Sequence, residues 1–305
     1  MTTLVFGHKS PDTDSTGSPL IWEWFLNHTG IEAKAALLGA PNTEAAFVAE
    51  RWGFELPEVI ADVADDQSCV IVDTNNPAEL PGNINNANVL AIIDHHKLAG
   101  GLETKNPINI TIRPLACTAT IMHQMMGDHA GHMPEGIKGL MLSCILSDTL
   151  AFRSPTTTEM DKDVAEALAK DLGVDVDAYA SEMFEAKSDV SGFSDAELLR
   201  MDSKEYAVDG KKFRVSVLET TAPQIVLDRK ASLMETMPKV ADEDGVDQVL
   251  LFVVDILKEE ATMLIPNDLT KAVAEKSFDA TVDGDSVVLP GIMSRKKQII
   301  PNLKA

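Results

Sequence analysis

Ionisable side chains follow three short apolar runs in the first half of the chain, at 4–7, 69–72 and 89–93. They belong to His8, Asp12, Asp14, Asp73, Asp94, His95 and His96. Continuous apolar runs of this length are typical of strands buried on both faces of a parallel sheet. Because ligands bind outside the carboxyl ends of such strands, we expect these groups to meet in space although they lie far apart in the sequence.

A further carboxylate, Asp148, follows the apolar run 139–146. A charge buried there must be paired, protonated or bound to a metal. Two divalent cations roughly 3.5–4 Å apart need about six protein ligands, at least one of them a bridging carboxylate. The residues that could supply them are His8, Asp12, Asp14, Asp73, His95 and Asp148. Mixed imidazole and carboxylate ligands favour Mn²⁺, Co²⁺ or Fe²⁺.

Each of these residues also has a simpler explanation when taken alone. Asp12 and Asp14 could cap the helix that follows them, and Asp73 could lie in a turn. The two adjacent histidines could be surface residues, and Asp148 could be a satisfied acid at a helix end. The position of all of them at the ends of expected strands or helices favours a shared metal site.

The elements that would position these residues alternate in the manner of an α/β domain with a doubly wound parallel sheet. The expected strands are 4–6, 33–38, 69–72 and 89–93, and the expected helices are 15–28 and 43–52. Helix-period apolar positions predict four more helices at 121–126, 137–146, 160–169 and 176–184. Three histidines in this half, His123, His129 and His132, are either surface residues or a secondary metal site.

An aperiodic segment, KSDVSGFS at 187–194, predicts a linker. We therefore expect a metal-binding domain over 1–187, a linker over 188–195 and a smaller α/β domain with a mixed sheet over 196–305. The smaller domain should contain strands at 213–218, 248–255 and 262–265, a hairpin turn at 258–260, and a helix at 223–240. Its tail carries the dense basic cluster SRKKQ at 294–298, for which composition alone favours a solvated loop.

The chain of 305 residues contains 26 basic and 48 acidic side chains, which gives a formal net charge of −22. Such a field repels phosphate, so the protein is not expected to bind nucleic acid or anionic membranes in general. The three cysteines, Cys69, Cys117 and Cys144, form no Cys-x-x-Cys pair, which argues against a disulfide framework. We see neither a signal peptide nor a membrane span, and we expect a cytoplasmic protein.

Five segments carry a resemblance to a known family. They are GHKSPDTDS (7–15), DTN (73–75), DHH (94–96), SDTLAFRSPT (147–156) and SRKKQ (294–298). In this order they resemble the manganese-dependent, family II inorganic pyrophosphatases of the DHH phosphoesterase superfamily. The chain departs from the family at Ser10, where asparagine is usual, and segment 112–120 matches only from Cys117 onward.

The resemblance implies an active site in the cleft between two domains. It places His8 and Asp12 on one metal and Asp14 and His95 on the other, with Asp73 and Asp148 shared. His96 would face the substrate. Phosphate-binding side chains from the second domain would be Lys204, Arg295 and Lys296.

The expected reaction is hydrolysis of inorganic pyrophosphate by a water between two Mn²⁺ ions, with Co²⁺ as a possible substitute and Mg²⁺ arriving with the substrate. His96, Asp14 and Asp73 would be the catalytic residues, and the resemblance also implies a homodimer. One alternative is a DHH phosphodiesterase acting on short oligonucleotides or cyclic dinucleotides, although the glycine-rich motif usual in such relatives is missing. The other is a non-catalytic regulator that binds metal or phosphate.

Overall fold

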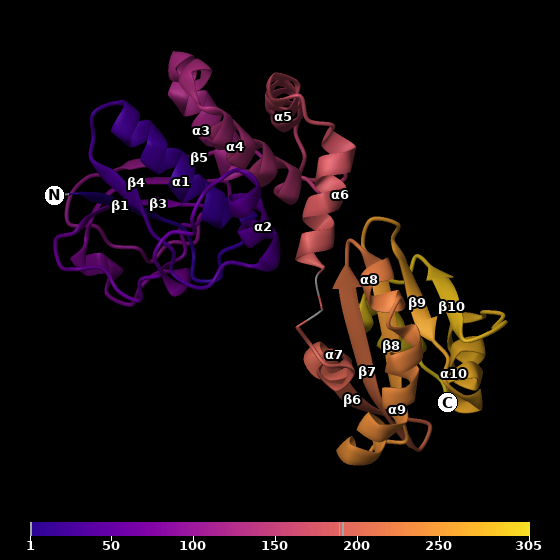
Figure 1. The fold of residues 1–305 in the computed structure, drawn as a ribbon. Helices are drawn as coiled ribbons and strands as arrows, with labels where there is room; N and C mark the ends of the chain where they lie inside the picture. The colour runs from indigo at the N-terminus through magenta and orange to yellow at the C-terminus, as the bar shows by residue number, and fades with distance from the viewer. Residues whose placement is uncertain (1, 189, 191) are drawn as a thin grey trace. The chain divides into compact units, whose positions relative to one another are not determined.

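The computed structural model describes residues 2–188, 190 and 192–305, without the side chain of Lys296. The chain forms two compact units, Met1–Lys187 and Ser188–Ala305 (Figure 1). Each unit contains one five-stranded sheet. Part of the expected linker, at residues 189 and 191, lies outside the described residues.

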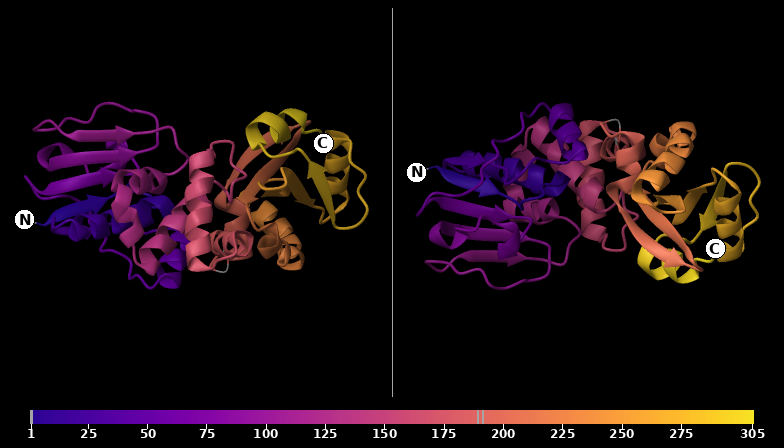
Figure 2. Two further views of the ribbon diagram at one scale, coloured as in Figure 1. Left: turned by 90° about the horizontal axis from the view of Figure 1, so that it is seen from above. Right: turned by 90° about the horizontal axis from the view of Figure 1, so that it is seen from below.

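The first unit contains a parallel sheet with the strand order β2-β1-β3-β4-β5. The strands are β1 (Thr3–Phe6), β2 (Ala33–Ala35), β3 (Ser68–Val72), β4 (Asn88–Asp94) and β5 (Asn109–Ile112), and Figure 2 shows them side by side. The predicted parallel-sheet domain is confirmed. Two details differ: β2 ends three residues earlier than expected, and β5 was not expected because it is an edge strand without a continuous buried run.

The described residues of the first unit also form six α-helices and three short 3₁₀-helices. They are α1 (Thr13–His28), α2 (Thr43–Arg51), η1 (Pro77–Glu79), η2 (Ile84–Asn86), α3 (Thr118–Met126), η3 (Gly127–His132), α4 (Glu135–Asp148), α5 (Glu159–Leu172) and α6 (Val176–Lys187). Helix α1 contacts both the sheet and α4. A side chain at Gly17 would place its Cβ 2.5 Å from the sulfur of Cys144, so glycine permits the close approach of α1 and α4.

One face of this sheet packs against loop segments. Phe6 and Ile71 share a buried cluster with Leu80 and Ile84, which lie beside or within the short 3₁₀-helices. The central strands β1 and β3 are buried along almost their whole length, so polar chemistry is expected at their carboxyl ends. Among the described residues, no helix combines the length and apolar character needed to cross a membrane.

The second unit contains a mixed sheet with the order β10-β9-β8-β7-β6. The strands are β6 (Ser203–Val208), β7 (Lys211–Thr220), β8 (Gln248–Asp255), β9 (Glu260–Leu264) and β10 (Ser286–Pro290). Only the β7–β8 pair is parallel. The predicted smaller α/β domain with a mixed sheet is therefore confirmed.

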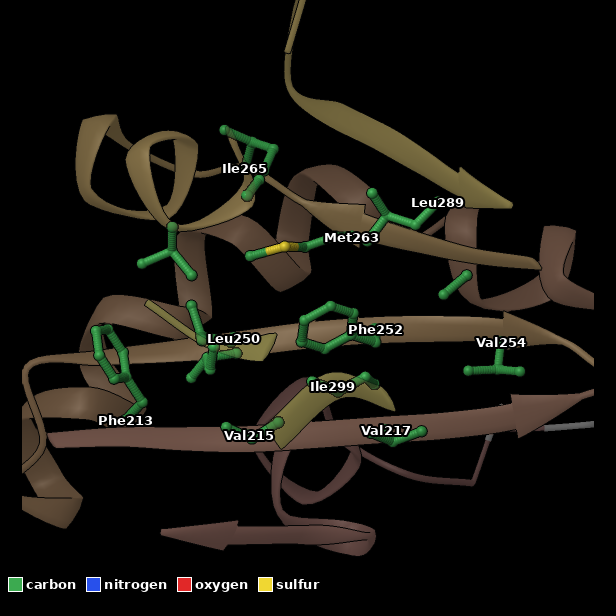
Figure 3. Close-up of a cluster of buried hydrophobic side chains, with 14 of the residues drawn as sticks. Phe213, Val215, Val217, Leu250, Phe252, Val254, Met263, Ile265, Leu289 and Ile299 are labelled. Carbon is green, nitrogen blue, oxygen red and sulfur yellow. The ribbon is translucent and has the colours of Figure 1, made fainter. Parts of the chain in front are cut away.

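Side chains of β8 alternate between two hydrophobic clusters. Leu250, Phe252 and Val254 enter the cluster shown in Figure 3, which Ile299 also joins. Val249, Leu251 and Val253 enter the opposite cluster. This period of two buries both faces of the strand, which explains its continuous apolar sequence.

Helices on the two sides of this sheet are α7 (Asp195–Met201), α8 (Pro223–Leu227), α9 (Lys230–Asp244), α10 (Asp268–Phe278) and α11 (Ile300–Asn302), with a π-helix η4 (Arg295–Ile299). The single helix expected over 223–240 is wrong, because the chain breaks between α8 and α9 at Asp228 and Arg229. At this break the Arg229 guanidinium binds the carboxylate of Asp195 and the carbonyl oxygen of Phe193.

Candidate metal centre

The carboxylate of Asp73 lies at the centre of a cluster of strand-end side chains. Asp73 follows β3 and adopts a left-handed backbone with φ of 58°. Its Oδ2 lies 3.5 Å from Nε2 of His8, and its Oδ1 lies 3.3 Å from Nε2 of His95. The two oxygens of one carboxylate therefore face two different imidazoles, as a ligand shared by two cations requires.

His8 and Asp12 lie on the loop between β1 and α1. Oδ2 of Asp12 is 3.9 Å from Nε2 of His8, while its Oδ1 accepts the backbone N–H of Ser15 at 2.9 Å and caps α1. The simpler explanation of Asp12 as a helix cap is thus correct, and it leaves the second oxygen directed at His8. A side chain at Gly7 would collide with the Ser15 hydroxyl, which accepts the N–H of His8 at 2.8 Å.

Asp14 and Asp148 form the buried side of the cluster together with Cys117. Ligand atoms of these three residues lie within 4.8 Å of one another. Asp14 accepts hydrogen bonds from the Ser18 hydroxyl at 2.6 Å and from the backbone N–H of Thr118 at 2.8 Å. Oδ2 of Asp148 is buried and has no hydrogen-bond partner among the described residues.

Burial and mutual repulsion raise the pKa of two of these carboxyl groups. For both Asp73 and Asp148 the main cause is the loss of water, and the negative charge of Asp14 raises the pKa further. In the described ion pairs, histidines are the only cationic partners of Asp73 and Asp12. A divalent cation would remove this repulsion and satisfy the unpartnered oxygen of Asp148, so the donor set fits Mn²⁺.

His95 and His96 are oriented by different partners. Nδ1 of His95 lies 3.3 Å from the carbonyl oxygen of Leu115, which leaves Nε2 directed at Asp73. Nδ1 of His96 lies 2.9 Å from Oδ1 of Asp94. The half-exposed ring of His96 therefore keeps its Nε2 for another partner.

Asp94 has a role that the sequence did not reveal. Burial raises the pKa of its carboxyl, but hydrogen bonds from His96 and Asn75 outweigh burial and lower the pKa overall. The amide of Asn75 donates to Oδ2 at 2.5 Å, so Asp94 remains an anion that fixes His96. The Asp-His-His motif thus combines one orienting carboxylate, one candidate ligand and one outward-facing imidazole.

Glu44 is a second residue that sequence reasoning missed. This buried carboxylate in the first turn of α2 accepts hydrogen bonds from the hydroxyls of Thr13 and Ser147, and it lies 3.6 Å from Nζ of Lys187. Thr13 and Ser147 each precede a candidate ligand. Glu44 therefore ties together the two segments that carry Asp14 and Asp148. A glutamate on the apolar side of a helix was the signal available in the sequence.

The turn after Asp148 has an unusual backbone. Leu150, Ala151 and Phe152 all adopt left-handed conformations, with φ of 48°, 49° and 70°. Such a conformation costs a residue other than glycine roughly 1–2 kcal/mol. Three consecutive residues in this conformation therefore store backbone strain in the turn after Asp148. Strain of this kind is common at functional sites, where the surrounding structure holds one geometry.

The expected phosphate-binding residues lie in the second unit. Arg295 begins η4, and its guanidinium binds the carboxylate of Asp202 at 2.7 Å and the backbone carbonyl of the same residue at 2.8 Å. Asp202 directly precedes β6, which carries the exposed Lys204. The structure thus brings Arg295 to the strand end near Lys204, whereas the side chain of Lys296 lies outside its described part.

Comparisons with known proteins agree across both units. Residues 2–147 match the DHH family, N-terminal domain, and residues 181–305 match the DHHA2 domain. Proteins named probable manganese-dependent inorganic pyrophosphatase from Lactobacillus acidophilus and Deinococcus radiodurans are 36% and 39% identical to this chain. Each alignment covers 98% of this chain and 97% of the relative.

A solved structure gives the same result. The crystal structure described as a Methanococcus jannaschii putative family II inorganic pyrophosphatase is 33% identical, with a TM-score of 0.63. The match covers 99% of this chain and 98% of that one. The chain therefore belongs to the manganese-dependent, family II inorganic pyrophosphatases, a family of hydrolases.

Proposed function

We propose that this protein hydrolyses inorganic pyrophosphate to two phosphates at the cluster around Asp73. The observation that carries the proposal is that the two oxygens of the Asp73 carboxylate face different imidazoles. One lies 3.5 Å from Nε2 of His8 and the other 3.3 Å from Nε2 of His95. Full-length similarity to proteins named inorganic pyrophosphatases supports the choice of substrate. The buried acidic cluster supports a dependence on divalent cations.

Six residues would hold two Mn²⁺ ions, for which Co²⁺ could substitute. His8 and Asp12 would bind one ion, Asp14 and His95 the other, and Asp73 and Asp148 would serve both. Bound there, the ions would neutralise charge on the phosphates and lower the pKa of a water held between them. Pyrophosphate would arrive as a complex with Mg²⁺.

The remaining residues of the first unit prepare the site for this substrate. Nδ1 of His96 is already hydrogen-bonded to the carboxylate of Asp94. Nε2 is therefore the atom that would donate a hydrogen bond or proton to pyrophosphate. Hydrogen bonds from Ser18 and Thr118 hold Asp14 in one orientation. Asp14 and Asp73 would act catalytically by holding the reacting groups in place.

Basic side chains of the second unit would bind the phosphates. Arg295 can form two parallel hydrogen bonds to a phosphate, whereas Lys204 and Lys296 act as point charges. Arg295 already donates to Asp202, with one hydrogen bond to the side-chain carboxylate and one to the backbone carbonyl oxygen. A phosphate would therefore compete with Asp202 for the guanidinium.

Each expected domain would have one role in this reaction. Residues 1–187 would bind the metal ions, residues 188–195 would form a linker, and residues 196–305 would bind the substrate. We also propose a cytoplasmic homodimer that binds neither nucleic acid nor membranes. The net charge of −22 supports the last point, because anionic polymers and surfaces are repelled.

The test is phosphate release from pyrophosphate by metal-stripped protein in Mg²⁺, with and without prior incubation with Mn²⁺. We expect rapid turnover that Mn²⁺ increases and that Asp148→Asn abolishes. A short oligonucleotide and a cyclic dinucleotide serve as competing substrates. Turnover of either one in place of pyrophosphate would instead support the phosphodiesterase alternative.

A further inference from the structure

Three histidines form a second cluster on the surface of the first unit. His28 is the last residue of α1, and His129 and His132 lie in η3. Ring nitrogens of the three residues lie within 4.8 Å of one another, and all three side chains are exposed. Of the three histidines that the sequence left as surface residues or a secondary metal site, His129 and His132 join this cluster, and His28 completes it in place of His123.

The spacing of the rings is close to that of a metal site. The ring centroid of His28 lies 5.5 Å from the centroid of His129 and 5.5 Å from that of His132. The centroids of His129 and His132 are 6.1 Å apart. Tetrahedral zinc with Zn–N distances of 2.0–2.1 Å separates the centroids of its imidazole ligands by about 5.2 Å. Small side-chain rotations at an exposed surface are enough to close this difference.

Neighbouring aromatic side chains hold two of the three rings. The ring of Trp24 stacks on His28 with a centroid distance of 5.1 Å and an interplanar angle of 16°. The ring of Phe25 meets His129 edge-on at 5.9 Å. Both aromatic residues belong to α1, so the helix that carries one ligand also positions another.

We propose that His28, His129 and His132 bind one Zn²⁺ ion, with solvent completing its coordination. Three neutral imidazoles suit Zn²⁺, Ni²⁺ and Cu²⁺, whereas Mn²⁺ and Mg²⁺ prefer carboxylate and water oxygens. The cluster is thus chemically distinct from the acidic metal centre. It is also spatially separate, because Asp12 and His28 lie at opposite ends of the 16-residue α1, about 24 Å long.

Metal counting tests the proposal. Protein loaded with Mn²⁺ is dialysed against Zn²⁺ and then against metal-free buffer, and the total metal per chain is measured by mass spectrometry. We expect His28→Gln combined with His132→Gln to lose one metal ion per chain. The matched control His123→Gln removes a histidine outside the cluster and should keep the full number.

Equal totals in the wild type and the double variant would overturn the proposal. A second readout does not depend on the metal centre or on pyrophosphate hydrolysis. Ni²⁺ bound at the cluster should quench the fluorescence of the stacked Trp24, and Trp24→Phe should remove at least half of that quenching. Quenching that persists unchanged in the double histidine variant would also contradict the site.

Discussion

The backbone N–H of Thr118 donates a hydrogen bond to Oδ2 of Asp14 at 2.8 Å, although 104 residues separate them. The Thr118 hydroxyl also donates to Oδ1 of Asp73 at 3.2 Å. The first turn of α3 therefore orients two candidate metal ligands, one in the first turn of α1 and one directly after β3. This contact is buried.

Removing the Thr118 hydroxyl should weaken the site more than the fold. Thr118→Val keeps the backbone bond to Asp14 and loses the bond to Asp73. Loss of such a supporting contact typically lowers metal affinity or activity by about 10–100-fold. We expect the Mn²⁺ concentration for half-maximal phosphate release to rise accordingly. Unchanged Mn²⁺ dependence would show that Thr118 does not position Asp73.

Thr16 offers a matched control for that substitution. Its hydroxyl is buried in α1 without a hydrogen-bond partner among the described residues. Thr16→Val should therefore leave Mn²⁺ dependence unchanged and raise the free energy of unfolding by about 1 kcal/mol, because an unsatisfied buried hydroxyl is removed. Denaturant unfolding measures this change, and a clear loss of stability would contradict it.

Truncating Glu44 should affect both stability and metal binding. Glu44→Ala leaves the hydroxyls of Thr13 and Ser147 without their shared acceptor. Each unsatisfied buried group costs roughly 1–3 kcal/mol, and the segments that carry Asp14 and Asp148 lose their tie. Calorimetric titration with Mn²⁺ should show at least tenfold weaker binding. Glu50→Ala, at an exposed position of the same helix, is the control and should change neither property.

In the strained turn at 150–152, a substitution to glycine should stabilise the protein, whereas the same substitution within a helix should destabilise it. Ala151 has φ of 49°, so Ala151→Gly should stabilise the protein by up to about 1 kcal/mol. Ala167→Gly in the exposed face of α5 should instead destabilise it by about 1 kcal/mol. The two variants are compared by denaturant unfolding. Equal losses in both would show that the turn stores no strain.

The raised pKa of Asp73 and Asp148 predicts how the metal-free protein responds to pH. Between the ordinary carboxyl pKa of about 3.9 and the raised native value, the folded state binds more protons than the unfolded state. Its stability should therefore fall as pH rises through that window. Thermal unfolding of chelator-treated protein measures this fall, and Mn²⁺ should reverse it. Asp148→Asn should flatten the pH dependence, whereas an identical profile in that variant would contradict the assignment.

Much of the fold could be predicted from the sequence because both sheets are built on buried apolar strands. The strand 248–255 was expected with its observed limits for this reason. The edge strands β5 and β6 and the short helix α7 have half-polar sequences, and their positions depend on tertiary neighbours. The break before α9 likewise depends on Arg229 binding Asp195, a contact between distant segments.

The candidate ligands could be proposed from the ends of strands and helices, but their supporting contacts could not. One carboxylate oxygen of Asp12 caps α1 and the other is directed at His8. The roles of helix cap and candidate ligand are therefore compatible in this residue. Glu44 and Thr118 act through partners about 30 to 100 residues away. No local pattern specifies such partners, because they meet only when the helices pack.

In the proposed function, pyrophosphate is hydrolysed at a site for two metal ions that share Asp73. The most direct measurement is phosphate release from pyrophosphate as metal-stripped protein is titrated with Mn²⁺ at a fixed Mg²⁺ concentration. We expect activity that rises and levels off at two equivalents of Mn²⁺ per chain. No release at any Mn²⁺ level, or a plateau at one equivalent, would contradict it.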